Sequence, residues 1–189
     1  MTTRLFFLVV LLQVGSLTAQ EFPKNELKYN IANTLAIASV EVGYERLVTY
    51  DGGIELELHF NDRINYHSEE GSREFKTHSV KLGYNYYFGT NNPGSGFFIN
   101  PFVKYRFGDF EETTTPELGT TNDTPPNEVV VVTDMSGFIV GIGAGYKWNF
   151  SNSFVVSLYG NIGRNFNEQV QERFTTIEFY GGLGIGYRL

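Results

Sequence analysis

The stretch IELELHFNDRINY, residues 54–66, alternates apolar and polar side chains over most of its length. The apolar residues of its first half stand at every second position: Ile54, Leu56, Leu58 and Phe60. Because successive side chains of a strand point to opposite faces, this period of two predicts a strand with one apolar and one polar face. Only Asp62 breaks the alternation. In a soluble sandwich the apolar face lies in the core, whereas in a membrane barrel it meets lipid and the polar face lines the lumen.

The first twenty residues, MTTRLFFLVVLLQVGSLTAQ, have the plan of a secretory signal peptide. Arg4 supplies the positive charge, an apolar run follows, and the small residue Ala19 precedes the expected cut. The apolar run is roughly half of the ~20 residues that a membrane-spanning helix needs. We therefore expect residues 1–19 to be a cleaved signal peptide and residues 20–189 to form one domain, which is a usual domain size.

The composition of the chain narrows its class. Its 189 residues include no cysteine, so no disulfide framework holds the fold. Asp and Glu number 21 against 14 Lys and Arg, for a net charge of −7, which argues against a nucleic-acid partner because such binders carry basic patches. Aromatic residues make up 16% of the chain and glycines number 21, a combination that favours strands over helices.

Strand-like segments recur along the chain, and no helical period of comparable strength appears. Eight strands are predicted: Leu27–Leu35, Ser39–Val48, Ile54–Tyr66, Phe75–Phe88, Phe97–Phe110, Val129–Trp148, Phe154–Asn165 and Ile177–Leu189. Because no clear turn residue lies within residues 28–46, that segment could also be one long strand, which would leave seven.

The predicted connections alternate in length. Three are short and turn-like: Thr49–Gly53, Gly89–Gly96 and Asn149–Ser153. Three are longer and polar: His67–Glu74, Glu111–Glu128 and Asn167–Thr176. Short turns at one end and long loops at the other are typical of outer-membrane barrels. The sequence therefore predicts an all-β, eight-stranded antiparallel up-and-down transmembrane β-barrel.

In this barrel the polar faces would fill the lumen and the apolar faces would meet lipid, because an eight-stranded interior is just wide enough for side chains. We predict a lumen charge network of Glu41, Glu45, Glu55, Glu57, His59, Arg63, Lys81, Lys104, Arg106, Lys147, Glu178 and Arg188. We predict lipid-facing positions at Ile54, Leu56, Leu58, Phe60, Val80, Leu82, Tyr84, Val140, Ile142, Leu183 and Ile185.

Three segments carry a family resemblance: Leu17-Thr18-Ala19-Gln20, VEVGYERLV at residues 40–48, and GGLGIGYRL at residues 181–189. With them, essentially all of the chain after the signal peptide resembles small outer-membrane β-barrel proteins of the outer membrane protein A and OmpX type. Such families end in an aromatic residue, whereas here Tyr187 lies two positions before the final Leu189. The resemblance implies an outer-membrane location with periplasmic termini and external loops. It also implies contact with outer-membrane lipid, lipopolysaccharide and the barrel-insertion machinery.

Residue types suited to catalysis occur, but not in a usable arrangement. His67-Ser68-Glu69-Glu70 and His78-Ser79 hold the types of a hydrolase triad, yet neighbours on a strand point to opposite faces. His59 is interpreted as a paired lumen residue. No metal-ligand spacing occurs, and the glycines of GIGAG at 141–145 stand at strand period rather than before a helix. We therefore expect no enzymatic activity, no cofactor and no metal.

The function expected from the sequence is a structural or surface-interaction role in the outer membrane. The loop at 111–128 is the best candidate for contact with an extracellular ligand. Three alternatives stay open: a narrow pore, a lipid-modifying outer-membrane enzyme, and a secreted soluble β-barrel with an apolar interior.

Overall fold

Eight antiparallel strands close into a barrel in the computed structural model, which describes residues 24–62, 66–68, 71–88, 92–114, 129–151 and 153–189. The wall strands are β1 (Asn25–Asn30), β2 (Val40–Leu47), β3 (Gly52–Phe60), β5 (Gly71–Phe88), β6 (Gly96–Thr114), β8 (Gly137–Asn149), β9 (Phe154–Asn165) and β10 (Ile177–Arg188). Each pairs with its neighbour along the chain, and β1 pairs with β10 to complete the ring. The prediction of an eight-stranded up-and-down barrel is confirmed. The predicted signal peptide lies outside the described residues.

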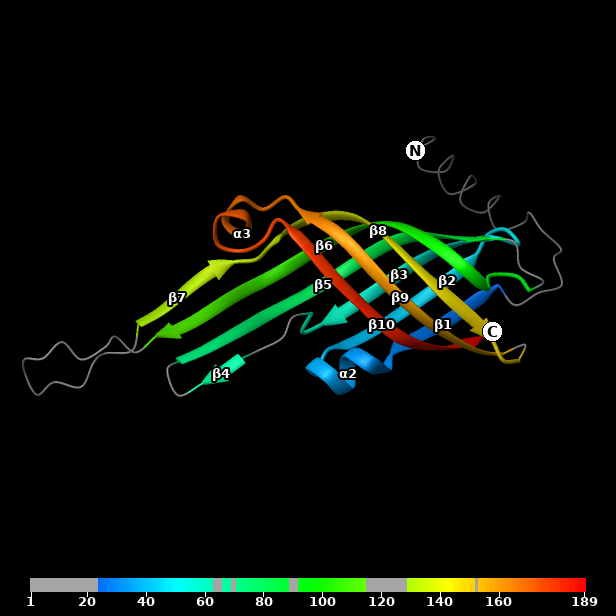
Figure 1. Cartoon of the computed structure of the whole chain (residues 1–189), viewed down its shortest axis with the longest axis horizontal. Coiled ribbons are helices and arrows are strands. Elements are labelled where there is room, and N and C mark those ends of the chain that lie inside the picture. The colour runs from blue at the N-terminus through cyan, green and yellow to red at the C-terminus, as the bar shows by residue number, and fades with distance from the viewer. Residues whose placement is uncertain (1–23, 63–65, 69–70, 89–91, 115–128, 152) are drawn as a thin grey trace, which may run out of the picture.

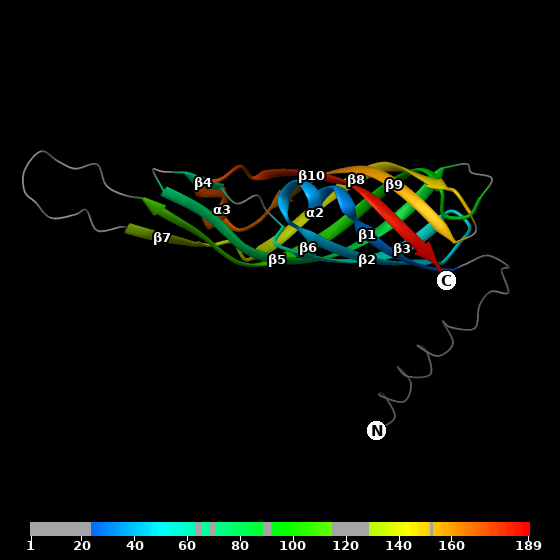
Figure 2. The same cartoon turned by 90° about the horizontal axis from the view of Figure 1, so that it is seen from below.

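The two ends of the barrel differ (Figures 1 and 2). One end, here called the short-turn end, carries the turns after β2 and β8 and the C-terminus at Leu189. At the other, long-loop end, β5 and β6 run on beyond the wall together with two short strands and a helix. Among the described residues, no helix is long and apolar enough to cross a membrane.

The predicted strand Leu27–Leu35 is wrong in its second half. β1 ends at Asn30, and the helix α2 (Ile31–Ile37) follows, so residues 28–46 hold two strands separated by a helix. The Asn30 side chain caps α2 by accepting a hydrogen bond from the Asn33 amide at 3.2 Å, and Ala38 ends it in the left-handed region at φ 52°. An asparagine cap, together with the helix formers Ala32, Leu35 and Ala36, outweighs the weak strand pattern.

The predicted strand Ile54–Tyr66 is also too long. β3 ends at Phe60 because Asn61 takes a left-handed conformation with φ 58°, which turns the chain. The short strand β4 (Tyr66–Ser68) then pairs with the start of β5. β5 begins at Gly71, so the second half of the loop predicted at His67–Glu74 is strand.

The predicted single strand Val129–Trp148 is two strands, β7 (Val129–Asp134) and β8, and both pair with β6. β6 runs to Thr114, so the first four residues of the loop predicted at 111–128 belong to it. The rest of that loop, 115–128, lies outside the described residues. The β6 arm of this hairpin was missed in the sequence because residues 111–114 are polar on both faces, where the strand projects past the apolar belt of the barrel wall.

The hairpin and the helix α3 (Glu168–Arg173) form an outer lobe, defined as residues 71–77, 108–114, 129–136 and 166–176. The segment Asn167–Thr176 was predicted as a loop, yet α3 forms because Asn167 caps it and Glu168 and Arg173 complement its dipole. The core of the outer lobe consists of the buried side chains Phe110, Met135 and Val170, and Phe75 and Phe174 pack against them.

Ion pairs tie α3 to the hairpin of the outer lobe. Glu112 accepts from Arg73 Nε at 2.7 Å and from the Arg173 guanidinium, and Arg173 also donates to Thr133 at 2.5 Å. The hydrogen bond from Arg73 and that from Arg173 lower the pKa of the Glu112 carboxyl. The lobe is thus joined by both apolar packing and charge.

Replacing Met135 with alanine is expected to loosen the outer lobe and leave the barrel intact. The side chain is 0% exposed, and truncating a buried methionine costs roughly 2–5 kcal/mol through lost contacts and a cavity. Amide hydrogen exchange should speed up in residues 129–136 and 166–176 but not in β9 or β10. If amide exchange became equally faster in β9 and β10, the outer lobe would not be a structural unit separate from the barrel wall.

Candidate functional site

The inward-facing side chains of the barrel form a continuous polar network, and its first layer lies at the short-turn end. Glu45, which is 0% exposed, accepts from Lys147 at 2.6 Å, from Lys28 at 3.1 Å and from the Tyr87 hydroxyl at 2.6 Å. Gly53 on the adjacent strand leaves room for this carboxylate, because a Cβ there would lie 3.0 Å from Glu45 Cγ. A single carboxylate therefore holds strands β1, β2, β5 and β8 together.

The last strand is locked into the same layer. Arg188 donates to Glu26 at 3.0 Å and to the carbonyls of Pro93 and Gly94 at 3.0 and 2.6 Å. Lys147 donates to the other oxygen of Glu26 at 3.0 Å. These contacts join β10 and β1, where the barrel closes, to the turn between β5 and β6.

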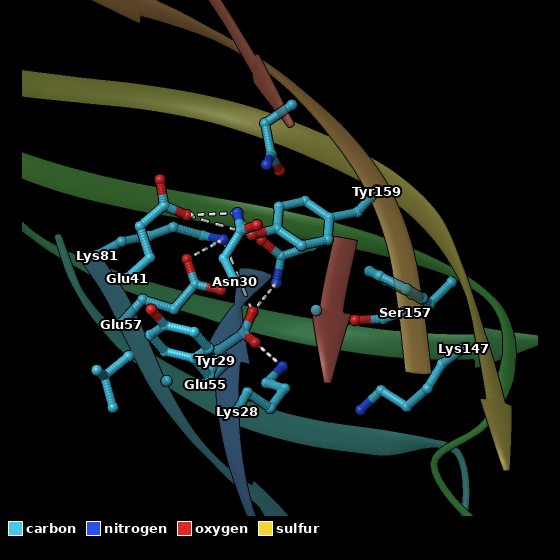
Figure 3. Close-up of a pocket in the computed structure, with 16 residues that line it drawn as sticks. Lys28, Tyr29, Asn30, Glu41, Glu55, Glu57, Lys81, Lys147, Ser157 and Tyr159 are labelled. Atoms are coloured by element: carbon cyan, nitrogen blue, oxygen red, sulfur yellow. Dashed lines mark hydrogen bonds and ion pairs between the residues drawn. The ribbon is translucent and has the colours of Figure 1, made fainter. Parts of the chain in front are cut away.

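A middle layer lies around Glu57 (Figure 3). Lys81 donates to Glu57 at 2.9 Å, and Lys28 is ion-paired with Glu55. His59 lies between two carboxylates, with Nδ1 3.5 Å from Glu41 and Nε2 3.3 Å from Glu57. Lys81 thus pairs with its direct neighbour across the β3–β5 strand pair, and Lys28 of β1 reaches past β2 to Glu55 of β3.

The third layer lies at the long-loop end, around Asp62. Lys104 Nζ lies 2.8 Å from Asp62, and Arg106 Nε donates to it at 2.9 Å. The two terminal nitrogens of Arg106 bind both oxygens of Glu178 at 2.7 Å each, a bidentate pair. Thr77 donates to Asp62 at 2.5 Å. Asp62 therefore has several partners although its position breaks the strand alternation.

The structure places the described members of the predicted network inside the barrel. These residues are all buried: Glu41, Glu45, Glu55, Glu57, His59, Lys81, Lys104, Arg106, Lys147, Glu178 and Arg188. Arg63 lies outside the described residues. The layers bring the others together in neighbouring groups rather than as one cluster.

Sequence reasoning missed several members of the network. Glu26 and Lys28 follow the same period of two in β1 and could have been found from it. Asp62 had no such signal, because it turns inward only after the left-handed Asn61. Tyr87 was missed because it is an aromatic residue within Tyr84–Phe88, where two tyrosines and a phenylalanine point outward.

The outward face is apolar. Ten of the positions predicted to face lipid are exposed, between 37% and 50% for each side chain: Ile54, Leu56, Leu58, Phe60, Val80, Leu82, Tyr84, Val140, Ile142 and Leu183. Ile185 is half-buried on the same face. A belt of this kind around buried charges is the reverse of a soluble protein, whose charges are exposed.

Little space remains among the first two layers. The cavity drawn in Figure 3 has a volume of about 30 Å³, room for one or two water molecules. The charges of the described interior as a whole nearly cancel, since seven carboxylates face six basic side chains. They are Glu26, Glu41, Glu45, Glu55, Glu57, Asp62 and Glu178 against Lys28, Lys81, Lys104, Arg106, Lys147 and Arg188. Pores select ions with rings of one charge sign, which this interior lacks.

The residue types suited to catalysis are not assembled in the described part of the chain. His78 is exposed on the outer face, whereas its neighbour Ser79 is buried in the lumen. His67 and Ser68 lie on β4, and Glu69-Glu70 lie outside the described residues. No group of three His, Cys, Asp or Glu side chains among the described residues suits a metal ion.

Solved structures with the same architecture are outer-membrane barrels. Ail, the attachment invasion locus protein of Yersinia pestis, matches with a TM-score of 0.52 and 12% identity over 89% of this chain and 99% of that one. Ail in complex with the heparin analogue sucrose octasulfate matches with a TM-score of 0.47 and 12% identity, over 88% and 94%. The N-terminal β-barrel domain of Pseudomonas aeruginosa OprF matches with a TM-score of 0.45 and 18% identity, over 90% and 100%.

The likeness to the first of these structures supports the fold alone. The resemblance to small outer-membrane barrels that the sequence suggested is thereby confirmed at the level of fold. No curated protein matches the chain in sequence. A family model does match it, over residues 5–187, and the protein belongs to that family, described as "Protein of unknown function (DUF3575)".

Proposed function

We propose that this protein is a structural or surface-interaction barrel of a bacterial outer membrane, with a lumen too full to conduct. The observation that carries the proposal is the inverted distribution of side chains. Charges such as Glu45 and Arg106 are buried inside, and side chains such as Leu58 and Ile142 form the exposed outer belt. Apolar side chains are stable in that position when lipid surrounds them.

The proposal also fixes an orientation and a maturation route. Residues 1–19 would be removed as a signal peptide and residues 20–189 inserted by the barrel-insertion machinery. The short-turn end and both termini would then lie in the periplasm, and the outer lobe would lie outside the cell beside lipopolysaccharide. Short periplasmic turns and longer external loops are the usual arrangement.

The first test is the gel mobility of the protein in the outer-membrane fraction, with and without boiling in detergent. A closed barrel resists detergent because all its wall strands are paired, so the unboiled protein should run as a separate band. A single band, or protein found only in the soluble fraction, would contradict the proposal and favour a secreted soluble β-barrel.

A narrow pore is the second candidate function, and the small inner cavity argues against it. Planar-bilayer recordings should show no stable open channel in the unmodified protein. Long-lived unit conductances would overturn the non-conducting lumen. A lipid-modifying activity would require a catalytic group outside the described residues, and unchanged lipid profiles in a deletion strain would remove that alternative.

Replacing residues 115–128 with a two-residue turn is expected to leave assembly intact. β6 and β7 are already paired up to Thr114 and Val129, so a tight turn can join them. The heat-dependent band shift should persist. Loss of the band shift would show that the segment is structural.

A further inference from the structure

The first half of β10 lacks a paired neighbour on one side among the described strands. β1 pairs with β10 only from Gly184 to Arg188, because β1 ends at Asn30 where α2 begins. Over residues 177–183, no strand of the described chain pairs with the edge of β10 that faces away from β9. The helix α2 packs there instead (Figure 1).

A cavity of about 570 Å³ lies behind this unpaired edge. It is lined by Asn33 of α2, by the Asp62 layer and by residues Ile177–Gly181 of β10. Its size falls within the range of small-molecule sites, whereas the inner cavity of about 30 Å³ has room only for water. The edge of β10 thus separates this polar cavity from the outer face of the barrel.

The polar groups with spare capacity in this cavity are mainly hydrogen-bond donors. Both oxygens of Glu178 are held by Arg106, and Glu41 accepts from Asn30 and Asn33. The Tyr180 hydroxyl, by contrast, is buried without a hydrogen-bond partner among the described residues.

Lys104 completes the donor set. Its ammonium carries three N–H groups and has one carboxylate partner, Asp62 at 2.8 Å, among the described residues. Lys104 Nζ also lies 4.8 Å from the centre of the Tyr180 ring, so the ammonium and the hydroxyl belong to one site. Occupied carboxylates beside available donors suit an acidic group as ligand.

An apolar groove of about 600 Å³ lies on the outer face of β6, β8, β9 and β10 and shares Phe179 and Tyr180 with the polar cavity. Ala144 and Gly160 form its floor, between the side chains of Ile142 and Ile162. A Cβ built on Gly160 would meet no atom within 4 Å, so the space above it is open. A polar cavity and an apolar groove that share Phe179 and Tyr180 of β10 match the two ends of an amphiphile.

We propose that these two cavities bind one single-chain amphiphile with an acidic head group, a carboxylate or a phosphate. The head group lies beside Lys104 and Tyr180, and the chain passes the unpaired edge of β10 and lies along Phe179 in the outer groove. The inference rests on the proposed function only in placing the outer groove in lipid, from which such a molecule would enter.

The test uses the mature protein in phosphatidylcholine nanodiscs and hexadecanoate with a nitroxide at its chain end. Spin-label spectra should show an immobilised component. Unlabelled hexadecanoate or hexadecyl phosphate should displace it at roughly tenfold lower concentration than hexadecanol, because a hydrogen bond to a charged group is worth at least that factor. Inorganic phosphate should not displace it. Equal displacement by the alcohol, or displacement by free phosphate, would overturn the proposal.

Two variants, each with a matched control, test whether the amphiphile occupies the polar cavity and the outer groove. Tyr180→Phe removes only an unpartnered hydroxyl, and it should weaken binding of the acid about tenfold. Tyr159→Phe is its control, because that hydroxyl bonds Asn30 at 2.9 Å beside the inner cavity. Gly160→Leu fills the groove and should abolish immobilisation, whereas Val80→Leu on β5 enlarges an outward residue elsewhere and should not.

The outcomes separate this inference from the proposed function. Unchanged binding in Tyr180→Phe and Gly160→Leu, or equal losses in the controls, would overturn the amphiphile site even if the heat-dependent band shift persists. Absence of the band shift in the unmodified protein would contradict the outer-membrane barrel itself, and the amphiphile site with it.

Discussion

Replacing Leu58 with arginine should destabilise the lipid-embedded barrel by roughly 2–4 kcal/mol, the cost of a cation facing the bilayer midplane. Leu58 is 40% exposed and pairs across the sheet with Val42 and Val80, both of which also face outward. In water the same exposed site would accept arginine at little cost. Denaturant unfolding in lipid vesicles, followed through Trp148 fluorescence, measures the difference.

The control for this variant is Gln169→Arg, an exposed position on α3 in the outer lobe. It adds the same charge where the proposed orientation puts water, so its unfolding free energy should stay within about 0.5 kcal/mol of the parent. An arginine at Leu58 that costs no more than one at Gln169 would show that the outer belt does not face lipid.

Replacing Glu45 with alanine should cost about 3–5 kcal/mol, because it leaves buried cations without their carboxylate. Lys147 and Lys28 lose a partner at 2.6 and 3.1 Å, and the Tyr87 hydroxyl loses its acceptor. Combining this change with Lys147→Met should restore part of the lost free energy of unfolding, since one of the two unpaired lysine charges is then removed. Urea unfolding of the three variants in the same vesicles gives the coupling energy.

The matched comparison is Glu111→Ala in the outer lobe. Glu111 accepts from Lys76 at 2.6 Å, but their side chains are 33% and 55% exposed, so solvent screens the pair. Exposed ion pairs contribute about 0–1 kcal/mol. Similar losses for Glu45→Ala and Glu111→Ala would mean that the interior is hydrated enough to screen its charges and that the lumen is not closed.

The two ends of the described barrel interior differ in how much space they leave. Around Glu45 and Glu57 the charges pair with one another and only a few water molecules fit. Toward the long-loop end, α2 replaces a paired strand beside β10, and the Tyr180 hydroxyl has no hydrogen-bond partner among the described residues. A barrel of this kind would hold its shape at one end and make its contacts at the other.

For most of the strand residues singled out in the sequence, the side of the wall that they occupy could be predicted from the alternation alone. Glu57 lies inside and Leu58 outside because a strand alternates its side chains, and a one-residue shift would reverse the entire row. Eight such rows, with connections of alternating length, were enough to predict the closed barrel. The direction of the apolar face followed from those connections rather than from any one strand.

Other features were decided only by the tertiary structure. Asp62 becomes the partner of Lys104 and Arg106 because Asn61 turns the chain after β3, and neither residue signals this locally. The helix α2 and the outer lobe replace predicted strand and loop because capping asparagines and a small apolar core stabilise them. The pairing of acids with bases, and the unpaired edge of β10, depend on contacts between residues far apart in the sequence. Periodicity assigns a side chain to a face, but only the closed barrel determines which side chains meet across the lumen.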